Sequence, residues 1–512
     1  MPPTSEPATR SERRQDFPRR VSKPFFVVIA VVSIAGFVGW LDRAASQPPP
    51  RAAANETRTL RDFGVIGDGV ADDSVAIQRA VDSRLGDLRF SRGTYRITRT
   101  ITVDLDTVGP TSFVATGTAR IVMEGSGPAI RFIGTHGGTA APKTVQENVW
   151  QNQRSPMVDG VEIVGGHPDA CGIEADGTMQ LTLTRVVVRK ALHGIHLVNR
   201  NRNVIISDCH LYENRGVGVF YDQVNLHQSN LIGSHISYNE GGGVVIRGGD
   251  VRNVHIGTCD IEGNMGGDGS APTANVLLDS TGGSIGEVAI VGCTIQHTHD
   301  APNSANIRIN GESTARSFTK ETRHGNITIA DNVLSDVQVN LDISNTRGVT
   351  ITGNTMWKGF ARNVRAVNCE SIVMSGNVFD RSPRYHYGDG PTAKLGILFE
   401  RCVGCTMVGN HLEQSGDTTA ALVIRNSSHF NITGCTILDC SPCGILLENV
   451  SRSRISDCLI DETDASGEPT LSLRATGGSG NMVIDNLLGC GQEINEGFVA
   501  RPSIKQPIGE TP

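Results

Sequence analysis

Histidine and carboxylate side chains recur at matched positions of a short repeated phrase, and such side chains can move protons. His210, His235 and Asp260 each stand one residue after the same position in three successive phrases. If successive phrases stack, His235 lies between His210 and Asp260. A carboxylate there could hold one imidazole and tune it as a general base near neutral pH. The spacing therefore predicts a candidate proton-transfer site on one face.

A second column of polar residues lies two positions further along each phrase. It contains Tyr212, Ser237 and Glu262, with Arg189 at the equivalent place one phrase earlier. Lyases and C5-epimerases of acidic sugars need a base, a cation that neutralises the sugar carboxylate and often a tyrosine. The candidate catalytic residues, called the histidine patch below, are Arg189, His210, Tyr212, His235, Asp260 and Glu262.

The two acidic residues of the patch allow a different reaction. Asp260 and Glu262 stand two apart on one expected strand, which places their Cα atoms about 6.6 Å apart on the same face. Carboxyl groups separated by roughly 6.5 to 9.5 Å suit an inverting glycosidase. Outward positions of any exported solenoid are polar, however, so these columns can equally be a solvated surface.

Two further groups are expected to contact a saccharide. A third column, Asn214, Asn239 and Asn264, continues the outward alternation. Of the long intervals at residues 264–275, 299–325 and 380–394, the last contains Arg384, Tyr385 and Tyr387. Aromatic faces stack on sugar rings and arginine pairs with uronate carboxylates. These six residues are the candidate substrate-binding residues, although a loop of this kind can also simply pack on the neighbouring coil.

The element that must position these residues is the repeat itself. Its phrases, such as NVIISDCHL, NVHIGTCDI and GVTITGNTM, end in Cys or Asn at one reference position and recur roughly every 25 residues. The twelve occupants of this position are Val186, Cys209, Ser234, Cys259, Cys293, Asn332, Asn354, Asn377, Asn410, Cys435, Cys458 and Asn486. Apolar β-branched residues alternate around it, which is typical of strands. Because no long segment has helical periodicity, we predict a parallel β-helix whose like residues stack about 4.8 Å apart.

The front of the repeat region resembles a known superfamily. Residues 62–82, DFGVIGDGVADDSVAIQRAVD, followed by FSRGTYRI at 90–97, are similar to the opening of the pectate-lyase-superfamily right-handed β-helix. Polygalacturonases, rhamnogalacturonases, alginate epimerases and phage tailspikes share that fold. The resemblance implies an all-β fold, a single-stranded right-handed parallel β-helix. It also implies calcium as a candidate cofactor, because related lyases use it to hold a uronate. The Asn-Thr-Asp motif of polygalacturonases and the Asp-Pro-His motif of alginate epimerases are absent, so no catalytic residue carries over.

A short helix is expected at the start of the solenoid. Asp72-Asp73-Ser74 is a helix-start signal, and Val75, Ile77, Ala80 and Val81 then fall mostly on one helical face. We expect this segment to cover the first coil, whose open end would otherwise recruit other chains. The Asp72-Asp73 pair is therefore interpreted as structural.

The N-terminus predicts export. Six basic residues precede the uncharged run at 24–41, which at 1.5 Å per residue is about 27 Å long, enough to cross a membrane. The basic flank should stay cytoplasmic, so the repeats lie in the periplasm or at the cell surface. A cleaved secretory signal ending at Ala44-Ala45-Ser46 is the alternative and would release a secreted protein. The expected organisation is a basic tail (1–23), a transmembrane anchor or signal (24–41), a linker (42–57), a cap with the first strands (58–110), the β-helix (111–490) and a C-terminal tail (491–512).

The cysteines and the charge exclude some classes. Most of the 12 cysteines fall at inward positions and are expected to be small buried hydrophobes. The CxxC pairs beginning at Cys402 and Cys440 are spaced like zinc ligands but stand at different places around the coil. His297 and His299 lack a third ligand, so no metal site is predicted. The net charge of −7 is spread along the chain, which gives no indication of a nucleic-acid partner.

Three functions remain open. The first is an exported lyase or epimerase acting on an acidic polysaccharide of pectin or alginate type. The second is a non-catalytic surface scaffold that binds glycan or a cell-envelope partner. The third is an inverting glycoside hydrolase that uses Asp260 and Glu262. The fold alone does not decide among them.

Overall fold

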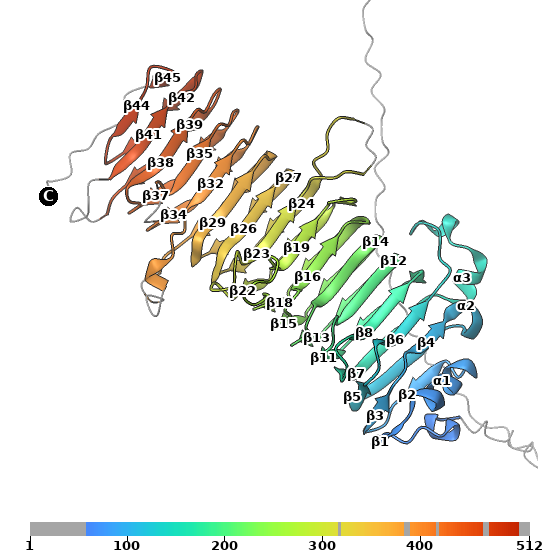
Figure 1. Ribbon diagram of the computed structural model, residues 1–512. Helices are drawn as coiled ribbons and strands as arrows, with labels where there is room; N and C mark the ends of the chain where they lie inside the picture. The colour runs from blue at the N-terminus through green and yellow to red at the C-terminus, as the bar shows by residue number, and fades with distance from the viewer. Residues whose placement is uncertain are drawn as a thin grey trace, which may run out of the picture. The chain divides into compact units, whose positions relative to one another are not determined.

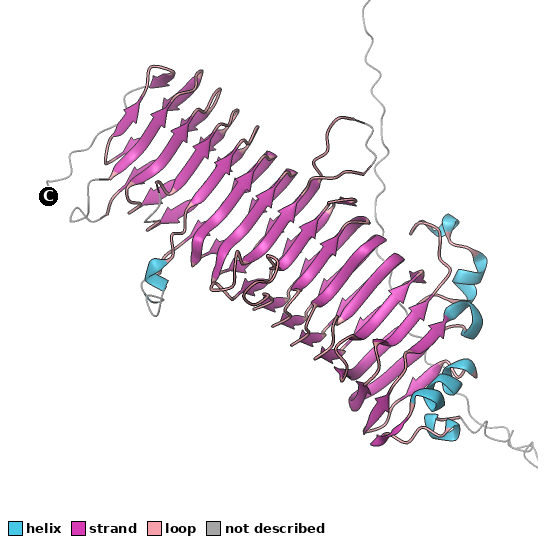
Figure 2. Ribbon diagram, viewed as in Figure 1, coloured by secondary structure: helices cyan, strands magenta, loops and turns pink. Residues whose placement is uncertain are grey.

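The described residues form one continuous stack of short strands (Figure 1). The computed structural model describes residues 58–315, 319–382, 384, 390–415, 419–463 and 470–500. Strands cover most of this region and helices gather near its start (Figure 2). Each strand pairs in parallel with the strand one coil later in the chain, and the described strands form three such stacks. The repeat region is therefore a parallel β-helix, as the spacing predicts.

The first stack holds the predicted histidine patch. Its strands are β11 (Val187–Arg189), β13 (His210–Tyr212), β15 (His235–Ser237), β18 (Asp260–Glu262), β22 (Thr294–Gln296), β25 (Val333–Leu334), β28 (Thr355–Met356), β31 (Val378–Phe379), β34 (His411–Glu413), β37 (Thr436–Leu438), β40 (Leu459–Asp461) and β43 (Leu487–Leu488).

The second stack follows it around the coil. Its strands are β4 (Ile101–Asp104), β6 (Gly127–Ile133), β8 (Ala170–Asp176), β12 (Ile195–Ser207), β14 (Val217–Ile232), β16 (Gly242–Arg247), β19 (Ala274–Asp279), β23 (Ala305–Asn310), β26 (Val337–Ser344), β29 (Gly359–Val367), β32 (Ile397–Glu400), β35 (Leu422–Arg425), β38 (Cys443–Glu448), β41 (Leu471–Thr476) and β44 (Gln492–Ile494).

The C-terminal halves of β12 and β14 bend into the third stack, which completes the coil. Its other strands are β10 (Thr182–Thr184), β17 (Asp250–Gly257), β20 (Ser284–Ile285), β21 (Val288–Val291), β24 (Gly325–Ala330), β27 (Arg347–Thr352), β30 (Glu370–Ser375), β33 (Thr406–Val408), β36 (Asn431–Thr433), β39 (Arg454–Ser456), β42 (Asn481–Ile484) and β45 (Phe498–Ala500). Pairing thus continues past residue 490.

The twelve reference residues face the core, as predicted. All have an exposed fraction of at most 3%. The residue before each one sits at a bend with a positive φ, such as Asp208 (54°), Gly233 (57°) and Thr258 (50°). The bend turns the chain from the third stack into the first, and the small residue after it fits inside the corner.

Buried asparagines line two corners as hydrogen-bonded ladders. In the first ladder each side-chain Nδ2 donates to Oδ1 one step along, at 2.7 to 2.9 Å, through Asn214, Asn239, Asn264, Asn275, Asn306, Asn340 and Asn363. The second ladder joins Asn332, Asn354, Asn377 and Asn410 in the same way, at 2.9 Å. These amides satisfy one another where no water reaches.

The stack begins with four strands that pair irregularly and a set of short helices. The strands are β1 (Asp68–Asp72), β2 (Asp87–Arg89), β3 (Gly93–Ile97) and β5 (Ser112–Met123), followed by β7 (Met157–Gly165) and β9 (Thr178–Met179). The helices are η1 (Leu60–Phe63), α1 (Ser74–Asp82), α2 (Leu105–Val108), η2 (Pro142–Thr144) and α3 (Glu147–Asn152), with η4 (Gly390–Thr392) much later.

Helix α1 lies where the start signal predicts it and contacts β4 and η1. Ile77, Ala80 and Val81 are buried, whereas Val75 is 49% exposed, so Val75 does not belong to the packed face. Asp73 is 1% exposed, and its carboxylate accepts hydrogen bonds from the backbone N–H groups of Ile66 (2.7 Å) and Gly67 (3.0 Å). A carboxylate used in this way holds the backbone, which agrees with its structural interpretation.

The inserted loops differ from expectation in one place. The interval 299–325 was expected to be a single loop, but β23 lies inside it and pairs with β19 and β26. The insertions there are residues 297–304 and 311–324. Across the part of the chain that the structure describes, no helix is both long enough and apolar enough to span a bilayer. The 24–41 segment lies outside the described residues.

Candidate functional site

The first column of the histidine patch has the predicted register. His210 pairs with His235, and His235 with Asp260. The two imidazole rings stack with centroids 5.0 Å apart, and His235 Nδ1 lies 3.6 Å from Asp260 Oδ2. Thr294 Oγ1 donates a 2.8 Å hydrogen bond to Asp260 Oδ1. The side chain of His235 is 59% exposed, so the column lies open to solvent.

The second column also has the predicted register, but its arginine is engaged. Tyr212 pairs with Arg189 on one side and Ser237 on the other. Arg189 Nε lies 2.9 Å from Glu162 Oε1, while Arg120 holds the other oxygen at 2.7 Å. Burial by itself would raise the pKa of Glu162, but the hydrogen bonds from both arginines lower it overall. Arg189 therefore already has a carboxylate partner, and its side chain is only 21% exposed.

The sequence analysis did not single out Tyr238, an exposed tyrosine beside the histidine patch. Tyr238 is 55% exposed, and the negative charge of Glu262 raises the pKa of its phenol. Gln296 Nε2 donates to Glu262 Oε2 at 3.2 Å from the next coil. Tyr238 follows the patch strand directly and sits at a bend with φ of 54°, so its side chain projects from the corner. Its place directly after the patch strand was the available signal.

The prediction that Asn214, Asn239 and Asn264 face solvent is wrong. All three are fully buried in the first asparagine ladder. The cause is the bend: Glu213 and Tyr238 have φ of 53° and 54°, which breaks the two-residue alternation, so the next residue points inward. These asparagines are therefore not substrate-binding residues. Of the loop candidates, Arg384 is exposed, and Tyr385 and Tyr387 lie outside the described residues.

A groove with charged walls lies on the second stack. This loop groove, of about 680 Å³, is open to solvent and is lined by Pro272, Asp300, Ala301, Pro302, Asn303, Arg308, Gln338, Val339, Asp342, Ala361 and Arg365. Two inserted segments form its wall, one before β19 and the other before β23. The histidine patch contributes none of its lining. Figure 1 shows these loops beside β22 and β23.

The floor of the loop groove is formed by three charged residues that pair across neighbouring strands of the second stack. Arg308 pairs with Asp342, and Asp342 pairs across β26 and β29 with Arg365. Arg308 Nε lies 3.0 Å from Asp342 Oδ2, and Arg365 NH1 lies 2.8 Å from Asp342 Oδ1. Arg308 also donates to the backbone oxygens of Thr273 (2.9 Å) and Asn303, which fixes both loops. Arg365 is 42% exposed and has only the Asp342 contact among the described residues, so its remaining N–H groups are available.

A third group of titratable residues lies at the start of the second stack. His196 stands between Glu174 (3.5 Å) and Asp222 (3.2 Å), and its ring stacks on Phe220 with centroids 5.4 Å apart. Burial alone would lower the pKa of His196, but hydrogen bonds to both carboxylates raise it. Arg131 holds Glu174 in turn at 2.6 Å. Because every member has a partner of opposite charge, this group is a satisfied ionic ladder.

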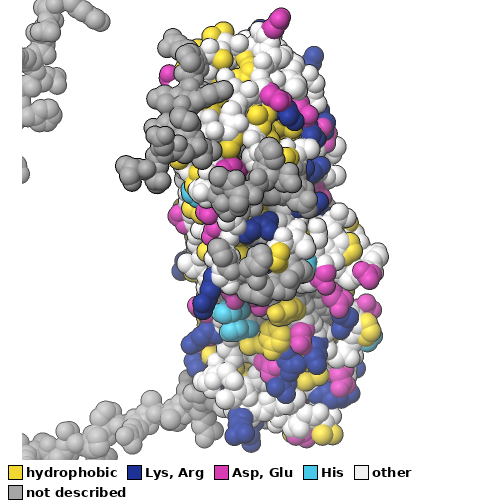
Figure 3. Space-filling view, turned by 90° about the vertical axis from the view of Figure 1, so that its left-hand side faces the viewer, with side chains coloured by type: hydrophobic (Ala, Val, Ile, Leu, Met, Phe, Trp, Pro, Cys, Tyr) yellow, Lys and Arg dark blue, Asp and Glu magenta, His cyan; other side chains and the backbone are white. Residues whose placement is uncertain are grey.

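Side chains of all charge types mix on the surface. On the face shown in Figure 3, acidic and basic side chains are interspersed, and histidines gather beside lysine or arginine side chains. The described residues contain no group of three or more His, Cys, Asp or Glu side chains placed to hold a metal ion. All twelve cysteines are free thiols, and all but Cys490 are buried, as expected from their inward positions.

Two family descriptions match parts of the chain. Residues 148–299 match the right-handed beta helix region, and residues 286–495 match the family described as periplasmic copper-binding protein (NosD). Neither match spans half of the chain. Together with the parallel coil pairing, they define this chain as a right-handed parallel β-helix protein. In its C-terminal coils it is similar to the NosD family.

The chain is similar to several solved structures at low identity. A tailspike protein of the E. coli bacteriophage HK620, in complex with a pentasaccharide, is 11% identical and matches over 87% of this chain and 80% of that chain (TM-score 0.49). The A-module of an Azotobacter vinelandii mannuronan C-5 epimerase is 15% identical over 74% and 94% (0.39). The Dettilon tailspike is 14% identical over 73% of this chain and only 65% of its own length (0.44). No curated protein sequence matches the chain.

Proposed function

We propose that this protein binds an acidic polysaccharide and that the loop groove is its binding site. The observation that carries the proposal is Arg365, whose guanidinium group bonds Asp342 through one nitrogen and leaves its other N–H groups toward an open groove. Arginine pairs with carboxylates through two parallel hydrogen bonds. Asp300 and Gln338 add acceptors for sugar hydroxyls, and Pro272 and Pro302 add apolar surface for the ring faces.

Binding can be measured by titration calorimetry with galacturonate and mannuronate oligosaccharides. We expect Arg365→Gln to weaken binding about tenfold or more, because a hydrogen bond to a charged group contributes about 1.5 to 3 kcal/mol. The matched control is Arg474→Gln, in the same outward column but outside the groove and paired with Glu493 at 2.8 Å. Equal binding by Arg365→Gln and the wild type, or no binding of any acidic oligosaccharide, would reject the proposal.

A second candidate is elimination or epimerisation at the histidine patch. It is favoured by the 3.6 Å approach of His235 to Asp260, which suits a general base. The assay is incubation with pectate and alginate: an unsaturated uronide indicates elimination, and a changed C5 configuration indicates epimerisation. His235→Gln should abolish either product. New reducing ends without unsaturation, lost in Asp260→Asn, would instead indicate the Asp260 and Glu262 glycosidase.

We also propose that the β-helix lies outside the cytoplasm and that residues 24–41 anchor it. The basic flank before this run supports that orientation, and the family that matches residues 286–495 is described as periplasmic. The full chain should stay in the membrane fraction after an alkaline wash. A soluble product beginning after residue 46 would show a cleaved signal instead. Because the described residues hold no suitable ligand cluster, neither copper nor calcium is part of the proposal.

Finally, we propose that α1 caps the first coil. Its buried Ile77, Ala80 and Val81 support this role, since they cover apolar residues that would otherwise meet water.

A further inference from the structure

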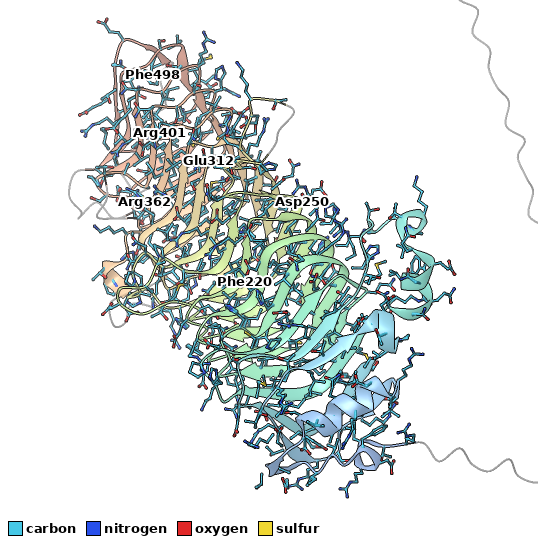
Figure 4. The ribbon with its side chains drawn as sticks, turned by 45° about the vertical axis from the view of Figure 1, so that its right-hand side comes forward. Phe220, Asp250, Glu312, Arg362, Arg401 and Phe498 are labelled. Carbon is cyan, nitrogen blue, oxygen red and sulfur yellow. The ribbon has the colours of Figure 1, made fainter. Side chains whose placement is uncertain are left out.

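Three arginines, two on one coil and the third two coils later, lie near one carboxylate at the corner between the second and third stacks. Arg202 pairs with His227, and His227 with Arg252. Arg200 and Asp250 stand two residues before Arg202 and Arg252. We call these five residues the arginine–histidine cluster. Figure 4 labels Asp250 and, on a neighbouring coil, Phe220.

The hydrogen bonds of the three arginines end on neutral oxygens. Arg200 donates to the backbone oxygen of Gly138 (2.7 Å). Arg202 donates to the backbone oxygens of Asn201 and Asn225 (2.7 Å each) and to Asn225 Oδ1 (2.6 Å). Arg252 bonds the backbone of Val251 and both oxygens of Ser284. These hydrogen bonds fix the three guanidinium groups in place without supplying negative charge.

Asp250 is the one carboxylate in ion-pair contact with this cluster among the described residues, and it is held loosely. It lies 3.4 Å from Arg252, 3.7 Å from His227 and 3.3 Å from Asn225 Nδ2. Glu321, which like Asp250 lies near His324, is held by Arg323 and Arg347. Three other partly buried arginines of the stack, Arg189, Arg308 and Arg323, each hold a carboxylate at close range.

Unsatisfied polar atoms concentrate at the same place. Arg202 is 1% exposed, and its Nε has no hydrogen-bond partner. His227 Nε2, which is 3.7 Å from Asp250, and Asn203 Oδ1 are also buried without a hydrogen-bond partner. The same is true of Nδ1 of His136, which lies near Arg200 and Arg202 and is 2% exposed. Buried charges and donors normally have partners. Burial, followed by the charge of nearby arginines, lowers the pKa of both His136 and His227 and keeps the rings neutral.

An open groove lies one residue further along the same three coils. Each basic residue of the column is followed by an amide at a bend with positive φ: Asn203, Gln228 and Asn253. These amides, with Val204, Ile205, Asn230 and His255, line a groove of about 480 Å³. Three coils thus repeat a basic side chain followed by an amide.

We propose that the arginine–histidine cluster is a binding site for an oxyanion, meaning a carboxylate, sulfate or phosphate group. An oxyanion supplies the missing negative charge and accepts the unused N–H groups of Arg202 and His227. The site lies on a different face from Arg365 and does not depend on the proposed function of the loop groove.

The test is calorimetric titration of the protein with sodium sulfate, phosphate and galacturonate, with chloride at matched ionic strength as the charge control. At least one oxyanion should bind with one-to-one stoichiometry while chloride does not, and the probe that binds most tightly identifies the group. His227→Gln and Arg252→Gln should each weaken binding tenfold or more, whereas Arg474→Gln should not change it. Arg365→Gln should also leave it unchanged, which separates this site from the loop groove.

A variant that should bind the oxyanion more tightly controls for misfolding of the arginine variant. Asp250→Asn removes the competing carboxylate and should tighten oxyanion binding several-fold, a result that general destabilisation would not give. Weaker binding in Asp250→Asn, equal binding in His227→Gln and the wild type, or no binding of any of the three oxyanions would overturn the proposal.

Discussion

The side-chain Nδ2 of Asn239 donates a 2.7 Å hydrogen bond to Oδ1 of Asn264, one coil further along the β-helix. Asn239 Oδ1 in turn accepts from Asn214 at 2.8 Å, and its Nδ2 also donates to the backbone oxygen of Leu211 at 3.0 Å. One buried amide therefore ties three coils together directly under the histidine patch. The ladder fixes the corner from which the patch and Tyr238 project.

Asn239→Ala should destabilise these coils strongly. The change leaves Nδ2 of Asn214 and the backbone oxygen of Leu211 short of partners in a dry interior, at a cost of about 3 kcal/mol or more. The loss should appear as a lower urea midpoint and as faster amide hydrogen exchange in β13, β15 and β18. Asn230→Ala, on an exposed site of a neighbouring coil, is the control. Equal exchange rates in the two variants would show that the ladder contributes little.

The sequence analysis succeeded where a buried position repeats. Cys209, Ser234 and Cys259 share a small size because each follows a bend and enters the corner, so their alignment gives the correct register for every strand of the first stack. The pairing of His210 with His235 and Asp260 follows from that register alone. Burial is a strong constraint on residue type, and it leaves a visible pattern in the sequence.

The analysis failed where the backbone leaves strand geometry or where partners lie outside the repeat. The left-handed bend at Tyr238 turns Asn239 inward, and the two-residue alternation of a regular strand does not predict such a bend. Glu162, the partner of Arg189, precedes the first recognisable phrase. The loop groove was missed because Arg308 and Arg365 belong to the second stack, whose phrases are less regular and are separated by insertions.

The thiols of the folded protein should be unreactive with one exception. Burial raises the pKa of Cys209 to about 11 and that of Cys440 to about 12, so neither offers a thiolate at neutral pH. Cys490 is the only partly exposed cysteine of the twelve. A water-soluble thiol reagent should label one thiol quickly in the native protein and twelve in urea, and Cys490→Ser should remove the fast phase. Rapid labelling of several native thiols would contradict this burial.

Stability should fall as the pH drops below the ordinary histidine range, in part through His193. Its Nδ1 accepts a 3.1 Å hydrogen bond from the backbone N–H of Val217, which requires an unprotonated nitrogen. Burial, followed by the charge of His196, lowers the pKa of His193 from 6.5 to about 4. Between these values the unfolded chain binds a proton and the folded one does not, so the unfolding free energy decreases by up to about 3 kcal/mol as pH falls.

His193→Asn isolates this contribution, because its Oδ1 can still accept the Val217 hydrogen bond but does not titrate. Urea unfolding from pH 7 to pH 4 should give a smaller loss of stability in the variant than in the wild type. His196 acts with the opposite sign, since its raised pKa favours the folded state at low pH and that stability is lost as pH rises; it is present in both proteins and cancels in the difference. Parallel pH profiles would exclude His193 as the titrating group.

The first coil should depend on Asp73, which precedes helix α1, and not on Asp82, the last residue of that helix. Asp73→Ala removes a buried carboxylate that accepts from the N–H groups of Ile66 and Gly67, at a cost of about 2 to 4 kcal/mol. Because coils contact only their neighbours, the damage should stay local, with faster proteolysis and hydrogen exchange at residues 60–97 and little change beyond residue 200. Asp82→Ala, at the exposed end of the same helix, should behave like the wild type. If α1 caps the solenoid, the Asp73→Ala variant should also self-associate, because its uncovered coil offers unpaired strands to other molecules. A variant that opens locally yet stays monomeric would show that Asp73 stabilises the turn but that the helix is not needed as a cap.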